Sequence, residues 1–419
     1  MKLLIKNIKS VVQVEENPRL KVAGADMKKL PCIENAWLAI EDDKIADFGT
    51  MKDFPGISDW TNLTVIDATN KLVFPSWCDS HTHLVYAGTR EKEFVDRING
   101  LSYEEIAKRG GGILNSVKTL REASEEELVE SALKRLNEIM RMGTGAVEIK
   151  SGYGLSLDSE LKMLRVIRKL RALSPLTIKA TFLGAHAVPA DTSTQHSMTK
   201  AKYIDILINE MLPKIAEEKL ADYCDVFCER NYFTKEDTIK IISAAKKYGM
   251  KGKIHAEQLS HSGGVEGGVE CGAISVDHLE FVSDNDIQLL KKSETMPTIL
   301  PGAQWFLQLQ NPPARKMIDA GLPLAIASDY NPGSSPSGNI NFMLSLACVQ
   351  YKMTPEEAIN AATINSAYAM DLSKTHGSIA IGKQANVFIT KEISNYSFIP
   401  YSFANNLIET VIIGGKVIS

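Results

Sequence analysis

Residues 74–90 read FPSWCDSHTHLVYAGTR, a stretch in which a short apolar run leads into two closely spaced histidines. His81 and His83 lie two positions apart, and Arg90 follows seven residues after His83. Side chains two positions apart on a strand point to the same face, so both imidazoles can reach one ion. The stretch therefore predicts a buried strand that ends in a pair of metal-ligating residues.

Short apolar runs alternate with helical segments through the middle of the chain. The eight runs are KLVFPSW, GAVEIKSG, TIKATFLG, DYCDVFCE, KGKIHAEQ, AISVDHLEF, TMPTILPG and PLAIASDY. Ser124 with Glu127 predicts a capped helix that ends near Gly143, and Thr354-Pro355 predicts the start of another helix. Eight such alternations, without a glycine-rich nucleotide loop, favour an α/β fold with a closed (β/α)8 TIM barrel of the metal-dependent hydrolase type over a doubly wound sheet.

The two ends of the chain share a different pattern, in which apolar and polar residues alternate. It covers residues 1–14 and 36–49 at the start and residues 384–393 and 406–419 at the end, with turns at Asp42-Asp43 and Gly414-Gly415. This pattern is typical of antiparallel strands. We expect a small composite β-sandwich domain from residues 1–74 and 376–419, and a barrel domain from residues 75–375.

Composition narrows the class of protein. A net charge of -4 leaves no basic surface for nucleic acid, and no apolar run approaches the roughly 20 residues that span a bilayer. Six scattered cysteines make no disulfide framework, and we expect Cys224 and Cys228 to be packing residues. The N-terminal residues do not read as a signal peptide. We therefore expect a cytoplasmic protein without nucleic-acid or membrane partners, and a homodimer, since barrels with large exposed faces often pair.

The polar residues of such a barrel are most informative where its strands end, because TIM-barrel active sites lie at the C-terminal ends of the strands. We expect His196, His261 and His376 to be solvated, because they lie in polar, loop-like sequence. The candidate strand ends are His81-Thr82-His83, Lys150 to Gly154, His186, His255 to Gln258, Asp277-His278, and Asp329 to Ser334.

Two imidazoles on one face need one or two further ligands and an open position to make a catalytic metal site. His255 and Asp329 are the best placed to supply them. The alternative is that each histidine is a hydrogen-bonded core residue. The joint occurrence of His-x-His, a histidine and an aspartate at separate strand ends of one barrel favours the metal.

This set of features resembles the amidohydrolase superfamily. Within the superfamily, the chain is most similar to the enzymes that hydrolyse 4-imidazolone-5-propanoate to N-formimino-L-glutamate in histidine degradation. The segments that carry the resemblance are DSHTHLVYAGTR, IKSGYGL, FLGAHAVP, IHAEQLS, VDHLE and SDYNPGSSP. The resemblance extends over nearly the whole chain and implies hydrolysis of a carbon–nitrogen bond in a cyclic amide.

The resemblance also implies the ligands of the metal. They would be His81, His83, His255 and Asp329, holding one divalent ion per chain, zinc or iron, with manganese also compatible. Many relatives hold two metals bridged by a carboxylated lysine at strand four, but DYCDVFCERNYF contains no lysine. Lys150 at strand two is out of place for that role and is expected to be structural.

The resemblance assigns a small anionic heterocyclic substrate to the site. Arg90 would grip its propionate tail, since a guanidinium binds a carboxylate with two hydrogen bonds. The alternative for Arg90 is a surface arginine beside Glu91 and Glu93. The other implied substrate contacts are Tyr103, Tyr153, His186, Asn331, Gly333 and Ser334.

The catalytic residues implied are His278, Asp329 and Glu257. Asp329 would accept the proton of the attacking water, and His278 would steady the developing oxyanion. Some relatives carry glutamate three residues after the strand-five histidine, where this chain has Gln258. Either Gln258 contacts the ring, or Glu257, which shares the face of His255 on a regular strand, turns in.

Two other functions fit parts of the pattern. A deaminase or another cyclic amidohydrolase would keep the metal site, but a neutral heterocycle would give Arg90 no role. A non-catalytic barrel with a decayed site would be expected to lose at least one ligand, and all four are present.

Overall fold

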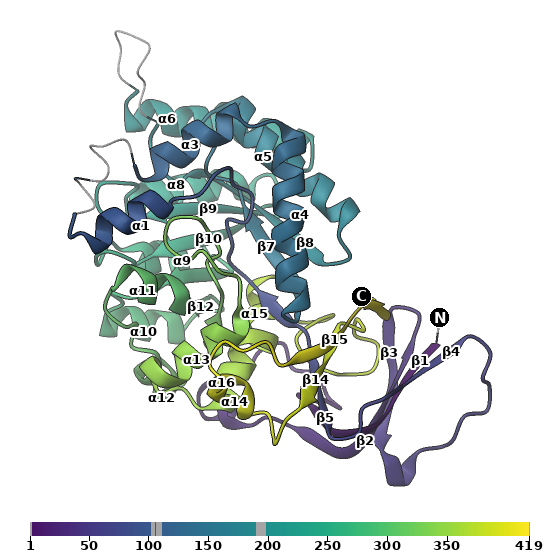
Figure 1. The fold of residues 1–419 in the computed structure, drawn as a ribbon. Helices are drawn as coiled ribbons and strands as arrows, with labels where there is room; N and C mark the ends of the chain where they lie inside the picture. Colours follow the sequence, from purple (N-terminus) through teal and green to yellow (C-terminus); the bar gives the residue numbers. More distant parts are fainter. Residues whose placement is uncertain (1, 102–104, 106–110, 190–197, 419) are drawn as a thin grey trace.

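The computed structural model describes residues 2–101, 105, 111–189 and 198–418, and its strands form two separate sheets (Figure 1). One is a parallel eight-stranded sheet in the middle of the chain, and the other is built from both ends. The expected division into a barrel and a terminal β structure is confirmed.

The parallel sheet curls into a nearly closed barrel. Its strands are neighbours in chain order, from β6 to β13. A parallel bridge between Thr82 and Tyr330, just beyond β6 and β13, joins the first and last strands of the barrel. The strands are β6 (Trp77–Asp79), β7 (Thr144–Lys150), β8 (Thr177–Ala185), β9 (Tyr223–Cys228), β10 (Lys251–Ala256), β11 (Ser275–His278), β12 (Met296–Ile299) and β13 (Ala325–Ile326).

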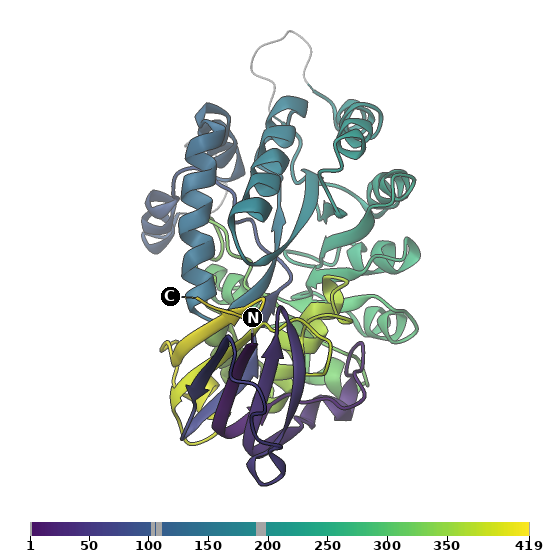
Figure 2. The same ribbon diagram turned by 90° about the vertical axis from the view of Figure 1, so that its right-hand side faces the viewer.

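Helices surround this barrel (Figure 2). Both capped helices that the sequence predicts are present, with Ser124 and Thr354 forming capping boxes. The helices are α1 (Glu91–Ile98), α3 (Ile113–Glu122), α4 (Glu125–Arg141), α5 (Leu157–Leu173), α6 (Lys200–Ile206), α7 (Leu212–Glu217), α8 (Lys235–Lys246), α9 (Gly264–Glu270), α10 (Asp284–Lys291), α11 (Pro301–Leu307), α12 (Ala314–Asp319), α13 (Ile340–Tyr351), α14 (Pro355–Asn360), α15 (Ser366–Ala369) and α16 (Phe398–Tyr401). Short 3-10 turns, η1 (Gly24–Lys28) and η2 (Met51–Asp53), and π-helical turns, η3 (Leu207–Met211) and η4 (Ala361–Asn365), complete them.

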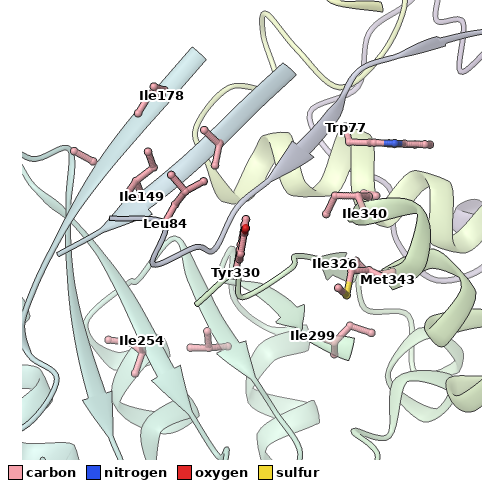
Figure 3. Close-up of a cluster of buried hydrophobic side chains, with 14 of the residues drawn as sticks. Trp77, Leu84, Ile149, Ile178, Ile254, Ile299, Ile326, Tyr330, Ile340 and Met343 are labelled. Atoms are coloured by element: carbon pink, nitrogen blue, oxygen red, sulfur yellow. The ribbon is translucent and has the colours of Figure 1, made fainter. Parts of the chain in front are cut away.

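Alternation along the barrel strands separates two kinds of buried residue. Ile149 and Ile254 belong to the large apolar core, to which Ile340 of α13 also contributes (Figure 3). Their neighbours on the same strands, Lys150 and His255, are buried polar residues. Because successive strand side chains point to opposite faces, the barrel has an apolar outer layer and a charged interior.

The terminal strands hydrogen bond into one mixed sheet, whereas a sandwich of two sheets was expected. Its order is β16-β15-β14-β5-β1-β2-β3, with β4 also paired to β1. The two ends meet where β14 lies antiparallel to β5. The strands are β1 (Lys2–Val12), β2 (Cys32–Glu41), β3 (Lys44–Thr50), β4 (Leu63–Asp67), β5 (Lys71–Pro75), β14 (Val387–Glu392), β15 (Ile408–Ile413) and β16 (Lys416–Ile418).

The run KLVFPSW, expected as one barrel strand, serves both sheets. Lys71–Pro75 pairs in the terminal sheet and Trp77 begins the barrel, while the backbone N–H of Ser76 between them donates to Asn386 O. The domain boundaries near residues 74 and 376 stay a prediction. Among the described residues, no helix is both long and apolar enough to cross a bilayer.

Candidate metal-binding active site

Closure of the barrel brings His81 and His83 next to the residues that follow β13. The backbone N–H of Asp329 donates to His81 O at 3.0 Å, and that of His83 donates to Tyr330 O at 3.0 Å. Residues 81–83 lie beyond the last residue of β6, so this pairing with 329–330 acts as an extension of the strand. Positions almost 250 residues apart in sequence thus share one end of the barrel.

Four potential ligand atoms converge there. His81 Nε2 and His83 Nε2 each lie 3.5 Å from Asp329 Oδ1. His83 Nε2 lies 3.4 Å from His255 Nε2, which comes from the end of β10. All four side chains are buried. The four residues that the sequence singled out as ligands therefore lie together.

A second layer of carboxylates orients two of these histidines. His81 Nδ1 lies 2.7 Å from Asp277 Oδ2, and His255 Nδ1 lies 3.0 Å from Asp225 Oδ2. The hydrogen bond to Asp277 fixes the Nδ1–H tautomer of His81, so its Nε2 lone pair points to the centre of the site, and the charge of Asp225 favours the same tautomer of His255. Asp277 was among the candidate strand-end residues but was given no role, and Asp225 was not singled out, because a buried acid inside a strand has no local signature.

Two buried lysines stand behind these aspartates. Lys150 Nζ lies 2.8 Å from Asp225 Oδ2 and 2.9 Å from Glu148 Oε1. Lys253 Nζ lies 3.8 Å from Asp277 Oδ2. The ammonium groups offset the negative charge that the carboxylates carry into the barrel. Lys150 therefore lies in the interior charge network, which agrees with the structural role expected for it.

The site has the electrostatic character of a cation site. Burial holds the pKa of His81 and of His83 well below the usual range, so both rings are neutral near pH 7. Lone pairs and a carboxylate oxygen that meet at 3.4–3.5 Å repel one another unless a cation lies between them. Two nitrogen or oxygen atoms that each lie about 2.1 Å from one ion can be about 3.4 Å apart. The residues present therefore fit a divalent metal ion.

A cavity of about 460 Å³ opens onto these ligands. His278 lines it, and groups with His81 and Asp329 as potential ligands whose atoms lie within 4.8 Å of one another. Tyr103 lies outside the described residues. The remaining residues expected to contact substrate all line the cavity: Arg90, Tyr153, His186, Gln258, Asn331, Gly333 and Ser334.

Tyr153 and His186 form one wall beside the ligands. The His186 ring stacks on His83 with centroids 5.3 Å apart, and its Nδ1 lies 3.0 Å from Gly152 O. Burial lowers the pKa of His186 to about 3, so the ring is neutral. This wall offers polar edges without adding charge.

The wall of the cavity also carries two guanidinium groups. Arg90 donates from Nε and Nη2 to Glu93 Oε2, at 2.9 and 2.7 Å. Arg97, two turns along α1, donates to Gly333 O at 3.0 Å and lies over the Phe306 ring. Arg97 was not among the residues predicted from the sequence, although its spacing of seven from Arg90 places both on one face of a helix. Both arginines line the cavity.

The loop after β13 is held together by Asn331. Its Oδ1 accepts from the N–H groups of Gly333 and Ser334, both at 2.8 Å, and its Nδ2 donates to Asp329 O at 2.6 Å. Ser334 Oγ donates to Asp329 Oδ2 at 3.1 Å. The loop thus orients the ligand carboxylate while Gly333 packs against Arg90.

Glu257 and Gln258 point in different directions. Glu257 has φ +55°, which ends the strand, and its carboxylate accepts from the N–H groups of Ser262 and Val265 at the start of α9. Gln258 lines the cavity. This geometry corrects the expectation that Glu257 could share the face of His255, because the left-handed backbone breaks the alternation.

The three histidines that were expected to be exposed to solvent do not all behave alike. His196 lies outside the described residues. The His261 side chain is 55% exposed. His376 is buried, with Nε2 3.0 Å from Thr177 Oγ1, so the expectation of a solvated side chain was wrong for it.

Known proteins resemble the chain in sequence and in fold. The sequence pattern of the Amidohydrolase family matches residues 72–418. An imidazolonepropionase from Christiangramia forsetii is 61% identical over the full length of both chains, and one from Flavobacterium johnsoniae is 59% identical over 99% of each. The crystal structure of an adenosine deaminase from Xanthomonas campestris with bound zinc has a TM-score of 0.70 at 16% identity, covering 99% of this chain and 92% of that one, which shows a shared fold.

Proposed function

The chain belongs to the imidazolonepropionases of the amidohydrolase family, and we propose that it catalyses their reaction. In this proposal its cavity binds 4-imidazolone-5-propanoate and one divalent metal ion, and the enzyme opens the ring to N-formimino-L-glutamate. The observation that carries the proposal is the convergence of three imidazole nitrogens and one carboxylate oxygen beside a cavity with two arginines. A metal ion held by these ligands would activate a ring amide for hydrolysis, and the arginines would bind an anionic tail.

His81, His83, His255 and Asp329 would hold the ion, which is zinc or iron in this proposal. When bound, such an ion supplies Lewis-acid activation of water and of the substrate carbonyl. Asp329 would also act as the general base, because a carboxylate beside the attacking water can take a proton from that water. Burial raises the pKa of Asp329, which makes the carboxylate a better base than an exposed aspartate.

His278 is placed to steady the oxyanion that forms on the ring carbonyl as the water oxygen attacks. Its pKa is lowered to about 4 by burial, so near pH 7 the ring is neutral and offers one N–H donor. The carbon–nitrogen bond of the ring then breaks, and the proton taken by Asp329 returns to the leaving nitrogen.

The other cavity residues bind and orient the substrate. Arg90 fixes the propionate tail, so that the ring amide meets the ligand cluster in one orientation. Gln258, as a neutral amide, can donate to and accept from the ring but cannot take a proton. Tyr153, His186, Asn331, Gly333 and Ser334 line the remaining walls. We further propose that the enzyme is a cytoplasmic homodimer.

Turnover of freshly prepared 4-imidazolone-5-propanoate, followed by loss of ring absorbance, tests this function. An imidazolone without the propionate, at the same concentration, is the matched control. We expect turnover of the first, and a loss of kcat/KM of roughly 10–100-fold for the second, because a charge-assisted hydrogen bond is worth about 1.5–3 kcal/mol. Turnover of a purine or pyrimidine amine instead would point to a deaminase and contradict the proposal.

A further inference from the structure

Glu280 is a buried carboxyl group that the proposed chemistry does not use. Its side chain is fully enclosed, and neither Oε1 nor Oε2 has a hydrogen-bond partner among the described residues. Burying a polar group without a partner is costly, and native structures rarely leave both oxygens of a carboxyl in that state. Such a group calls for a functional explanation.

The nearest polar atom recorded for Glu280 belongs to His278. Oε1 of Glu280 lies 3.7 Å from Nδ1 of His278, which also has no hydrogen-bond partner in the described part of the chain. Two orphaned groups thus face each other at a separation that a small side-chain rotation closes to a hydrogen bond.

The backbone produces this arrangement at a cost. His278 has φ +94° and Leu279 has φ +72°, both in the left-handed region that side chains other than glycine rarely adopt. The two residues bend the chain directly after β11 and bring residue 280 to the ring of residue 278. Strained consecutive residues of this kind persist where the surroundings hold them, often at active sites.

We propose that Glu280 is a positioning residue: its neutral carboxyl O–H donates a hydrogen bond to the unprotonated Nδ1 of His278 and so holds the ring with Nε2–H directed into the cavity. This inference rests on the proposed function, in which His278 is the donor to the oxyanion. Glu280 itself touches no substrate, and its effect is exerted through the imidazole.

The surroundings support a neutral glutamic acid as the donor. Burial raises the pKa of Glu280 well above its usual range, and the carboxylate of Glu229 raises it further. Glu280 also interacts electrostatically with Tyr351, and burial raises the pKa of the Tyr351 hydroxyl, which therefore stays protonated. With both Glu280 and His278 uncharged, the carboxyl hydrogen is the proton available for Nδ1, which leaves the ring hydrogen on Nε2.

A double-mutant cycle on the metal-loaded enzyme tests the inference. Glu280→Leu removes the donor at similar volume, and we expect it to lower kcat by roughly 10²-fold with KM little changed, as for loss of one oxyanion donor. Glu280→Gln is the matched control, because its amide N–H can still donate to Nδ1, and it should keep kcat within a few fold. In a His278→Ala background, Glu280→Leu should have almost no further effect.

The opposite results would overturn the inference. An unchanged kcat in Glu280→Leu, or an equal loss with and without His278, would show that Glu280 does not act through the imidazole. A readout independent of turnover is the 15N spectrum of selectively labelled histidine, with His278 assigned by its loss in His278→Ala. We expect Nε2 protonated in the wild type, and a hydrogen on Nδ1 instead would contradict the inference. If the wild type failed to open the ring, the proposed function would fail, while the spectrum would still decide the tautomer.

Discussion

Arg90 shares its guanidinium between a carboxylate of its own helix and the loop that carries Asp329. Glu93 accepts from two of its nitrogens, and a side chain at position 333 would collide with Nη1. The ion pair fixes the plane of the guanidinium before any substrate binds. Both alternatives for Arg90 therefore hold in part, because it is paired with an acidic neighbour and also lines the cavity.

Arg90→Ala is expected to raise KM by roughly 10–100-fold with a smaller change in kcat, because it removes a charge-assisted contact to the tail. Steady-state kinetics with 4-imidazolone-5-propanoate measures both constants. Glu93→Gln is the control, since it keeps the guanidinium in place with a weaker partner. An unchanged KM in Arg90→Ala would exclude the tail contact.

Asp277→Asn is expected to weaken metal binding by roughly 10–100-fold, because it removes the charge that orients and polarises His81. Competition with a chromogenic chelator measures the metal dissociation constant without reference to turnover. Thr298→Val, beside Asp277 on the neighbouring strand β12, replaces a hydroxyl without a hydrogen-bond partner among the described residues and should keep the wild-type affinity. Equal affinity in Asp277→Asn would show that the carboxylate has no influence on the ligand.

Residue spacing predicted the ligands but not their support. His81 and His83 were identifiable because a strand places alternate side chains on one face, and Asp329 because it follows a strand-like run. Asp277 was listed only as a candidate strand-end residue and Asp225 was not singled out, since nothing local distinguishes a buried strand acid that faces a histidine. The prediction that Glu257 could share the face of His255 was wrong, because a single positive φ reverses the direction of a side chain. The sequence does not specify that angle.

At the scale of elements, helix starts were the most predictable feature. Ser124 accepts from the N–H of Glu127, and the Glu127 carboxylate accepts from Ser124 N at 2.8 Å, as the capping motif indicates. Such contacts are local in sequence, so they can be identified without knowledge of the fold. The run KLVFPSW was less predictable, because its division between two sheets depends on pairing with Asn386, far along the chain.

Ser124→Ala is expected to lower the free energy of unfolding by about 1 kcal/mol, since it leaves N–H groups at the start of α4 without their cap. Urea denaturation followed by circular dichroism measures the change. Ser131→Ala, inside the same helix, is the control and should be neutral or slightly stabilising, because alanine favours helices. A similar loss in both variants would contradict a specific role for the cap.

At the scale of the whole molecule, a buried histidine joins the barrel to the segment that leads into the terminal sheet. His376 Nε2 lies 3.0 Å from Thr177 Oγ1 of β8, and the ammonium of Lys383 donates to His376 O at 3.0 Å. Burial lowers the pKa of His376 to about 4 from an ordinary value of 6.5. The unfolded chain therefore binds a proton more readily than the folded one between these two values.

Stability should fall as the pH decreases through this window, because protonation favours the unfolded chain. For His376 alone the loss between pH 7 and pH 5 is about 2 kcal/mol. We expect His376→Gln to show a smaller decrease in unfolding free energy over that interval than the wild type. His261→Gln, at an exposed position, should behave like the wild type. An equal decrease in His376→Gln would exclude His376 as a source of acid sensitivity.

The most direct test of the central claim measures bound metal and turnover on the same samples of wild type and Asp329→Asn. The account predicts about one zinc or iron per chain in the wild type, together with opening of the imidazolone ring. In Asp329→Asn it predicts a loss of turnover of roughly 10²–10⁴-fold. Ring opening by metal-free protein, or full activity in Asp329→Asn, would contradict it.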